Sequence, residues 1–129
     1  MRKYKGKYRS KFEETIAKWL QTRKIPFKYE PCKITYIVPE SKHTYTPDWQ
    51  VGDDNTIYWE SKGRLTAADR RKLLHIKASN PDLTIRVVLM NSDVKIRKGS
   101  PTSYGDWCEK NGFEFADFRH GGIPKKWLK

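Results

Sequence analysis

The stretch TYTPDWQVGDDNTIYWESKGR, residues 44–64, decides how this chain folds. Residues 44–51 and 56–62 are rich in aromatic and β-branched side chains, which favour strands. The four residues between them, GDDN, are turn formers. The pattern therefore predicts two antiparallel strands joined by a tight turn.

Three ionisable side chains lie in this predicted hairpin: Asp48 in the first strand, and Glu60 and Lys62 in the second. Because side chains alternate along a strand, Glu60 and Lys62 project from the same face, and Asp48 can point to it across the hairpin. Two carboxylates can hold a hard divalent cation such as Mg²⁺, which would polarise a phosphodiester and make hydroxide available. Lys62 would orient the water or offset charge in the transition state. The alternative is an Asp at a strand end beside a solvated ion pair, and spacing alone does not separate the two.

The chain carries a large excess of positive charge. Its 129 residues include 27 Lys and Arg against 15 Asp and Glu, which gives a formal net charge of +12. Such an excess favours a polyanionic partner, because basic clusters release the counterions that phosphates hold. The length predicts a single domain over residues 1–129, of which residues 1–9 form a flexible basic arm. The residues expected to contact nucleic-acid phosphates are Arg2, Lys3, Lys5, Lys7 and Arg9 in the arm, and Arg64, Arg70, Arg71 and Lys72 after the hairpin.

The cysteine content indicates a reducing compartment. Cys32 and Cys108 are the two cysteines, they form no CxxC motif, and no signal peptide precedes them. We expect free thiols, with burial in the core as the ordinary case. No apolar run approaches the ~18 residues that span a bilayer. The sequence therefore predicts a cytoplasmic protein that has no membrane association.

The rest of the chain alternates predicted helices and strands. Ser10 and Glu13 fit an S-x-x-E capping box ahead of apolar residues at helical spacing, which predicts a helix over residues 11–22. A second helix, residues 66–78, precedes the apolar run 84–90, which is typical of a strand covered on both faces. Shorter pieces are predicted to be extended at 24–39, helical at 103–110 and a strand at 113–116. A strand, a helix and a strand in series indicate a crossover unit, and so a mixed α/β fold.

Aromatic and histidine side chains beside the acids have more than one interpretation. Trp49 and Trp59 flank the acids, where they either stack on an unpaired base or, as we favour, pack in the core or on the sheet. His43 precedes Asp48, but Mg²⁺ favours oxygen ligands. We therefore expect His43 to make a hydrogen bond to DNA or to the backbone.

The pattern of Pro-Asp followed by Glu-x-Lys resembles the PD-(D/E)xK nuclease superfamily. Longer strings of residues point to one family within this superfamily. They are YRSKFEE (8–14), HTYTPDW (43–49), ESKG (60–63) and KGSPTSYGDWCEKNGFEFAD (98–117). In this order and at these spacings they resemble endonuclease I of the T-odd bacteriophages, a family of phage Holliday-junction resolvases. The resemblance runs from Tyr8 to Trp127, nearly the whole chain.

The resemblance implies the residues of an active site. The family uses Mg²⁺, with Mn²⁺ as a substitute, and one or two ions are expected in each site. A Glu on the first helix completes the site in the family, and its position in YRSKFEE is that of Glu13, whose other role as a capping residue is compatible. The family's Asp, Glu and Lys fall on Asp48, Glu60 and Lys62, and the main-chain carbonyl of Ser61 is an expected further metal ligand.

The resemblance also implies a fold, a substrate and an assembly. The expected fold is the αβββαβ core of the superfamily, and the expected substrate is branched DNA, four-way junctions above all, cut during recombination in the cytoplasm of a phage host. Two symmetric cuts need two sites, which a homodimer supplies. In the family the subunits exchange elements, so that Glu13 of one chain joins Asp48 and the Glu60–Lys62 pair of the other. Residues 33–41 form an extended run suited to crossing between protomers.

Two other functions remain open from the sequence. One is a nicking or homing endonuclease of the same fold that acts on duplex DNA. The other is a basic nucleic-acid-binding module without catalysis, against which the intact set of two acids and a lysine argues.

Overall fold

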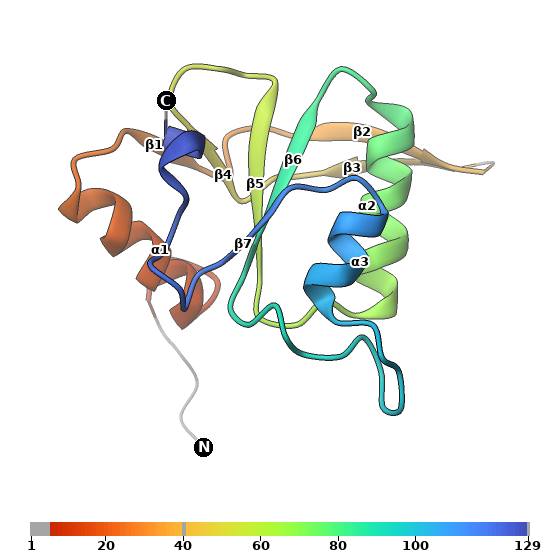
Figure 1. The fold of residues 1–129 in the computed structure, drawn as a ribbon. Helices are drawn as coiled ribbons and strands as arrows, with labels where there is room; N and C mark the ends of the chain where they lie inside the picture. The colour runs from red at the N-terminus through yellow and green to blue at the C-terminus, as the bar shows by residue number, and fades with distance from the viewer. Residues whose placement is uncertain (1–5, 40, 129) are drawn as a thin grey trace.

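A mixed five-stranded sheet forms the centre of the molecule (Figure 1). The computed structural model describes residues 6–39 and 41–128. The sheet has the strand order β1-β4-β5-β6-β7, and β2 and β3 form a separate antiparallel pair. The strands are β1 (Phe27–Tyr29), β2 (Ile34–Val38), β3 (Ser41–Tyr45), β4 (Trp49–Val51), β5 (Ile57–Lys62), β6 (Thr84–Leu89) and β7 (Phe115–Asp117). The helices are α1 (Lys11–Thr22), α2 (Ala67–Ser79), α3 (Tyr104–Lys110) and the final 3-10 turn η1 (Lys125–Leu128). The predicted mixed α/β class is confirmed.

The segment from β5 through α2 to β6 is the predicted crossover unit. β5 and β6 are parallel, and Lys62 at the end of β5 lies beside Leu89 at the end of β6. β7 is parallel to β6, with Asp117 beside Leu89. Because parallel strands end at the same edge of a sheet, one edge collects the residues that follow all three strands. The loops that leave β5 and β6 at this edge lie at the bottom of Figure 1.

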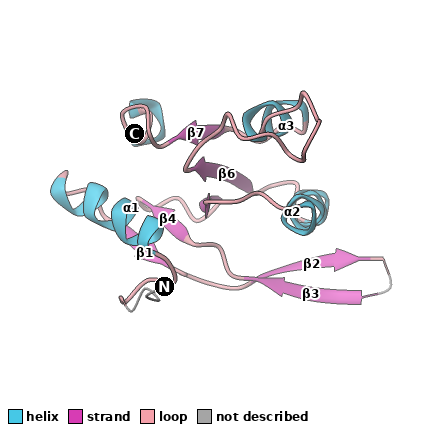
Figure 2. Cartoon of the chain, turned by 90° about the horizontal axis from the view of Figure 1, so that it is seen from below, coloured by secondary structure: helices cyan, strands magenta, loops and turns pink. Residues whose placement is uncertain are grey.

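The two faces of the sheet carry different helices (Figure 2). On one face, Trp49 and Trp59 pack with Ile16 of α1 in one apolar cluster. On the other, Val87 packs with Leu73 of α2 in a second cluster, which also includes α3. Both tryptophans are buried, which confirms that they pack in the core and leaves no ring surface for a nucleic-acid base.

The helix starts follow their capping residues. Thr66 and Ser103 are the N-caps of α2 and α3, and each forms a reciprocal box with an Asp three residues later. In α1 only half of the predicted box forms, because the Ser10 hydroxyl accepts from the Glu13 N–H while the Glu13 carboxylate accepts from the N–H of Arg9 instead. The carboxylate of Glu13 therefore bonds to the residue before the cap and not to the cap itself.

The structure corrects two predicted extended segments. Residues 44–51 do not form one strand, because β3 ends at Tyr45 and β4 begins at Trp49. Pro47 lies between them and has no N–H to donate to a strand ladder. The predicted link at residues 33–41 is likewise not one strand, since β2 folds back on β3 with Val38 opposite Ser41. Figure 2 shows this hairpin extending to one side of the five-stranded sheet.

The predicted thiols and the predicted arm have different outcomes. Cys32 and Cys108 are both free, as expected, and burial raises the pKa of the Cys108 thiol to about 12. Arg2, Lys3 and Lys5 of the basic arm lie outside the described residues. No helix in the part of the chain that the structure describes is long and apolar enough to cross a membrane.

Gly122 lies against α1 more closely than any side chain would allow. Gly121 and Gly122 both have positive φ angles, 86° and 80°. A methyl group on Gly122 would overlap the Trp19 ring, whereas one on Gly121 would meet nothing within 4 Å. Gly122→Ala should therefore lower the free energy of unfolding by about 3 kcal/mol, from backbone strain and overpacking together.

Urea denaturation of both variants tests this contact. Gly121→Ala should lose only about 1 kcal/mol, because it carries the backbone strain alone. Equal losses in the two variants would show that the contact between Gly122 and Trp19 does not constrain the fold.

Candidate active site

Asp48 is fixed at the sheet edge by hydrogen bonds to the next strand. Its Oδ2 accepts from the backbone N–H of Ser61 (2.9 Å) and from the Ser61 hydroxyl (2.8 Å). The Trp49 indole donates to the same hydroxyl at 3.2 Å. The Asp48 side chain is only 5% exposed. The carboxylate thus takes the place of a strand partner for Ser61, and its second oxygen is left for other contacts.

Glu60 and Lys62 project from the same face of β5, as predicted. Lys62 Nζ lies 3.2 Å from Glu60 Oε2 and 3.3 Å from Asp69 Oδ1 at the start of α2. The other oxygen of Glu60 accepts from the Tyr45 hydroxyl at 2.6 Å. Burial lowers the pKa of Lys62, but the attraction of Glu60 and Asp69 outweighs it and the net pKa is raised. Lys62 therefore stays charged between two carboxylates.

Glu13 reaches the same edge from the first turn of α1. Its Oε1 accepts from the Tyr29 hydroxyl (2.6 Å) and from the Arg9 N–H (3.0 Å). Tyr29 pairs with Trp49 across β1 and β4. Burial, and then the hydrogen bond to Glu13, raise the pKa of Tyr29. Its hydroxyl therefore remains a neutral donor to the carboxylate.

The three carboxylates repel one another in a buried place. Burial and then the charge of Glu60 raise the pKa of Asp48 to about 7, although the hydrogen bonds from Ser61 oppose the rise. The charge of Glu13 adds to the same effect. Burial also raises the pKa of Glu60, against the opposing effect of Lys62 and Tyr45. The raised pKa values of these two buried acids, Asp48 and Glu60, are typical of a functional site.

The donor chemistry of these residues fits a hard divalent cation. Asp48 Oδ1 and Glu13 Oε2 accept no hydrogen bond from the residues that the structure describes. Carboxylate oxygens are the ligands that Mg²⁺ prefers, and an added cation would offset the repulsion between them. Within the described chain, however, no three acidic, His or Cys side chains are gathered closely enough to form a ready metal cluster. The described chain by itself therefore brings no set of three such ligands together at this edge.

The predicted basic residues surround this edge unevenly. Lys72 lies 5.5 Å from the Tyr45 ring and is near enough to Glu60 to lower its pKa. Arg70 donates to the Leu65 carbonyl at 2.8 Å and so has a structural contact. Arg9 lies 3.7 Å from Glu30. The remaining predicted cations among the described residues, Lys7, Arg64 and Arg71, are exposed.

Sequence reasoning missed three side chains of the site, and the expected hydrogen bond of His43 to DNA or to the backbone stays a prediction. Tyr29 and Tyr45 donate to the acids, and Asp69 holds Lys62. Asp69 was visible in the sequence only as a capping residue, and the two tyrosines only as strand formers. His43 stacks on Tyr36 in the β2–β3 hairpin, with ring centroids 5.3 Å apart.

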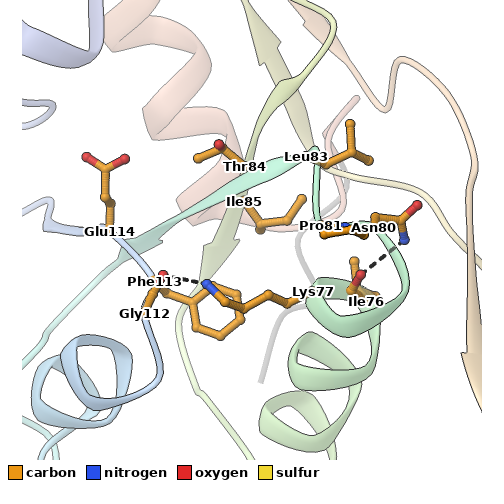
Figure 3. Close-up of a pocket in the computed structure, with 10 residues that line it drawn as sticks. All are labelled: Ile76, Lys77, Asn80, Pro81, Leu83, Thr84, Ile85, Gly112, Phe113 and Glu114. Atoms are coloured by element: carbon orange, nitrogen blue, oxygen red, sulfur yellow. Dashed lines mark hydrogen bonds between the residues drawn. The ribbon is translucent and has the colours of Figure 1, made fainter.

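A separate pocket of about 290 Å³ lies at the opposite end of β6 (Figure 3). Thr84 and Ile85, which open β6, line it, whereas the acids lie at the other end of the sheet. Lys77 donates to the Gly112 carbonyl at 2.8 Å and lies 4.9 Å from the Phe113 ring. Lys77 is the one cation that lines the pocket, and its hydrogen bond already joins α2 to the turn before β7.

Comparisons with known proteins extend over nearly the whole chain. The profile of the phage endonuclease I family matches residues 1–129. The chain is 45% identical to Endonuclease I of Escherichia phage T7 over 124 residues, which cover 96% of this chain and 80% of that protein. It is 47% identical to Endodeoxyribonuclease 1 of Enterobacteria phage T3 over 110 residues, 85% of this chain and 71% of that protein. The resemblance inferred from short strings is therefore confirmed.

The raised pKa of Asp48 predicts how the stability of the metal-free protein depends on pH. Its value of about 7 exceeds the ordinary 3.8, so between these values the folded chain binds more protons than the unfolded chain. The free energy of unfolding then falls as the pH rises, by on the order of 4 kcal/mol across the window. Asp48→Asn keeps an acceptor for Ser61 but cannot ionise, so it should be more stable than the wild type above pH 7 and gain nothing near pH 4.

Urea unfolding in EDTA from pH 4 to pH 9 measures this difference. Asp53→Asn in the exposed β4–β5 turn is the matched control and should follow the wild type throughout. Parallel curves for Asp48→Asn and the wild type would mean that Asp48 ionises in the fold as easily as in the unfolded chain.

Proposed function

This chain belongs to the phage endonuclease I family, and from that premise we propose that it is a Mg²⁺-dependent endodeoxyribonuclease that cleaves branched DNA, four-way junctions above all. The single observation that carries the proposal is the buried set of Asp48 and Glu60 with Lys62 at the carboxyl edge of the sheet. A stable fold gains nothing from such a set. A metal-dependent phosphodiesterase, in contrast, uses the negative charge of this set to hold a cation and the lysine to assist the reaction.

The side chains divide the chemistry between them. Asp48, Glu60, Glu13 and the Ser61 carbonyl would hold Mg²⁺, with Mn²⁺ as a substitute and one or two ions per site. The bound ion supplies Lewis-acid polarisation of the phosphodiester and a water of lowered pKa. Lys62, charged and directed by Glu60 and Asp69, orients the attacking water or offsets the charge that develops on the phosphate. In the overall reaction a water oxygen bonds to phosphorus, the bond from phosphorus to one nucleoside oxygen breaks, and that oxygen takes up a proton.

The surroundings of the site favour DNA held by its backbone. Arg64, Arg71 and Lys72 are exposed, Lys72 is near enough to Glu60 to lower its pKa, and a net charge of +12 attracts a polyanion. Such contacts read the position of phosphates and the shape of DNA rather than base edges. They suit a substrate that is recognised by its branch.

We further propose that the protein works as a homodimer whose subunits exchange α1, β1 and β2. The pairing of β2 with β3 is antiparallel and lies outside the main sheet, so the same pairing can form between two chains if the hairpin opens after Val38. Ile37 on this hairpin is 48% exposed, which is a large exposed fraction for an apolar side chain. The exchange would join Glu13 of one protomer to Asp48 and Glu60 of the other.

Substitution of the site residues tests the chemistry. Asp48→Asn, Glu60→Gln and Lys62→Ala should each reduce cleavage of a labelled four-way junction in Mg²⁺ by several orders of magnitude and leave junction binding largely intact. The reason is that these groups stabilise the transition state, whereas affinity comes from phosphate contacts elsewhere. Asp53→Asn serves as the control for lost charge. Near-wild-type cleavage by Asp48→Asn would refute the site, and equal cleavage of linear duplex would favour a nicking enzyme.

A mixed dimer tests the exchange of elements. Glu13→Gln and Glu60→Gln chains carrying different tags are co-expressed, and the heterodimer is purified. If the sites are shared, one site receives both substitutions and the other receives none, so the heterodimer should nick one strand of a junction although each homodimer is inactive. If each chain builds its own site, both sites are damaged. A folded heterodimer that binds junctions but does not cut them would exclude the exchange.

A further inference from the structure

The loop between β6 and α3, residues 90–103, leaves the sheet at the same edge as the acids. The Met90 N–H at its start donates to the Lys62 carbonyl at 3.1 Å. Ser92 is held by Asp117 at the end of β7 through its N–H (2.9 Å) and its hydroxyl (2.8 Å). Beyond this base the loop extends past the rest of the described chain at the bottom right of Figure 1. Its tip therefore projects from the side on which a substrate must approach.

The loop is an ordered hairpin rather than a loose connection. Lys95 bridges Ser103 in antiparallel fashion, and the Ile96 N–H donates to the Thr102 carbonyl at 2.9 Å. At the tip the Ser100 N–H donates to the Arg97 carbonyl at 3.1 Å. Ile96 also packs against the core. The turn needs Gly99, whose φ of 82° is the left-handed value that the third position of a type II turn requires.

The tip of the loop carries cations, two of which make no polar contact with the rest of the described chain. Lys95, Arg97 and Lys98 are all exposed. Lys95 donates to the Pro101 carbonyl at 3.1 Å, but the side chains of Arg97 and Lys98 form no ion pair or hydrogen bond with any described residue. The nearby acids are engaged elsewhere, since Asp93 pairs with Arg119 at 3.0 Å and Asp106 caps α3. Two exposed cations are thus held on a hydrogen-bonded hairpin with no partner in the described chain.

We propose that the tip of this loop, through Arg97 and Lys98, is a second contact with the DNA backbone that holds one arm of the substrate away from the phosphate that is cut. The inference rests on the proposed function and adds to it a surface outside the active site. Because the hairpin is already ordered, binding costs little conformational entropy there, and each contact releases counterions from the DNA.

The length of the loop predicts where this contact falls. Arg97 lies five positions after Ser92, so at about 3.3 Å per residue the tip reaches up to ~17 Å beyond the sheet edge. That distance is about half of the ~34 Å helical turn of duplex DNA. The contacted phosphates should therefore lie several base pairs along the arm.

The salt dependence of junction binding tests the contact. Arg97→Gln/Lys98→Gln, measured in EDTA so that nothing is cut, should reduce the slope of log affinity against log salt by up to ~1.8, at ~0.9 for each lost phosphate contact. Lys125→Gln/Lys126→Gln removes the same charge from exposed residues of η1, near the top of Figure 1, and should leave the slope close to that of the wild type. Arg97→Lys/Lys98→Arg keeps both charges and should retain the wild-type slope.

Uncharged methylphosphonate linkages locate the contact. Placed several nucleotides from the cleavage site, they should weaken binding by the wild type and leave the affinity of Arg97→Gln/Lys98→Gln unchanged, because that variant has already lost the contact. An unchanged slope in this variant, or an equal fall in the η1 variant, would overturn the inference and leave the proposed function standing. Wild-type protein that neither binds nor cuts junctions would instead overturn the proposed function. Thermal unfolding confirms that each variant is folded.

Discussion

The hydrogen bonds that Asp48 accepts from Ser61 are the contact on which the rest of the site depends. β4 is three residues long, and among the described residues it pairs with β5 at one position, where Trp49 lies opposite Trp59. Just before β4, the Asp48 carboxylate takes the place of a backbone partner for Ser61, so the strand pairing continues through a side chain. This arrangement places an acid at the edge where β5 presents Glu60. The fold therefore needs an oxygen acceptor at position 48 before any chemistry is considered.

The cost of the arrangement is the burial of like charges. Burial, and then repulsion by Glu60 and to a smaller extent by Glu13, raises the pKa of Asp48 to about 7. The chain offsets part of the cost with neutral hydroxyls from Tyr29 and Tyr45 and with the charge of Lys62. The remaining excess of negative charge is what a divalent cation offsets best. The same repulsion therefore supports the proposal that the site holds a metal.

The side of the molecule on which we propose that DNA binds combines three segments. The start of α2 and the loop before α3 leave this edge because the parallel strands β5 and β6 end together, and the start of α1 contributes Glu13, whose charge acts on Asp48. Each segment brings basic residues to an edge that also holds the acids. A polyanion that approaches this edge meets cations on several sides, which fixes the position of its backbone relative to the acids.

The sequence by itself determined the local features of this protein. Capping residues and apolar spacing predicted the three helices within a residue or two, and the alternation of side chains placed Glu60 and Lys62 on one face. These features depend on neighbours along the chain, which the sequence shows directly. Pro47 was also visible in the sequence. The pattern of residues nevertheless predicted one continuous strand where Pro47 separates β3 from β4.

Only the tertiary structure decided what lies around the acids. Tyr29, Tyr45 and Asp69 come from three different elements, and no spacing in the sequence relates them to Glu13, Glu60 or Lys62. The hydrogen bond from Tyr29 to Glu13 likewise joins residues sixteen positions apart. A pKa near 7 at Asp48 arises from burial and from neighbours brought together by folding. Local propensity fixes which residues form an element, but the environment of a charge depends on distances through space, and these exist only once the elements pack.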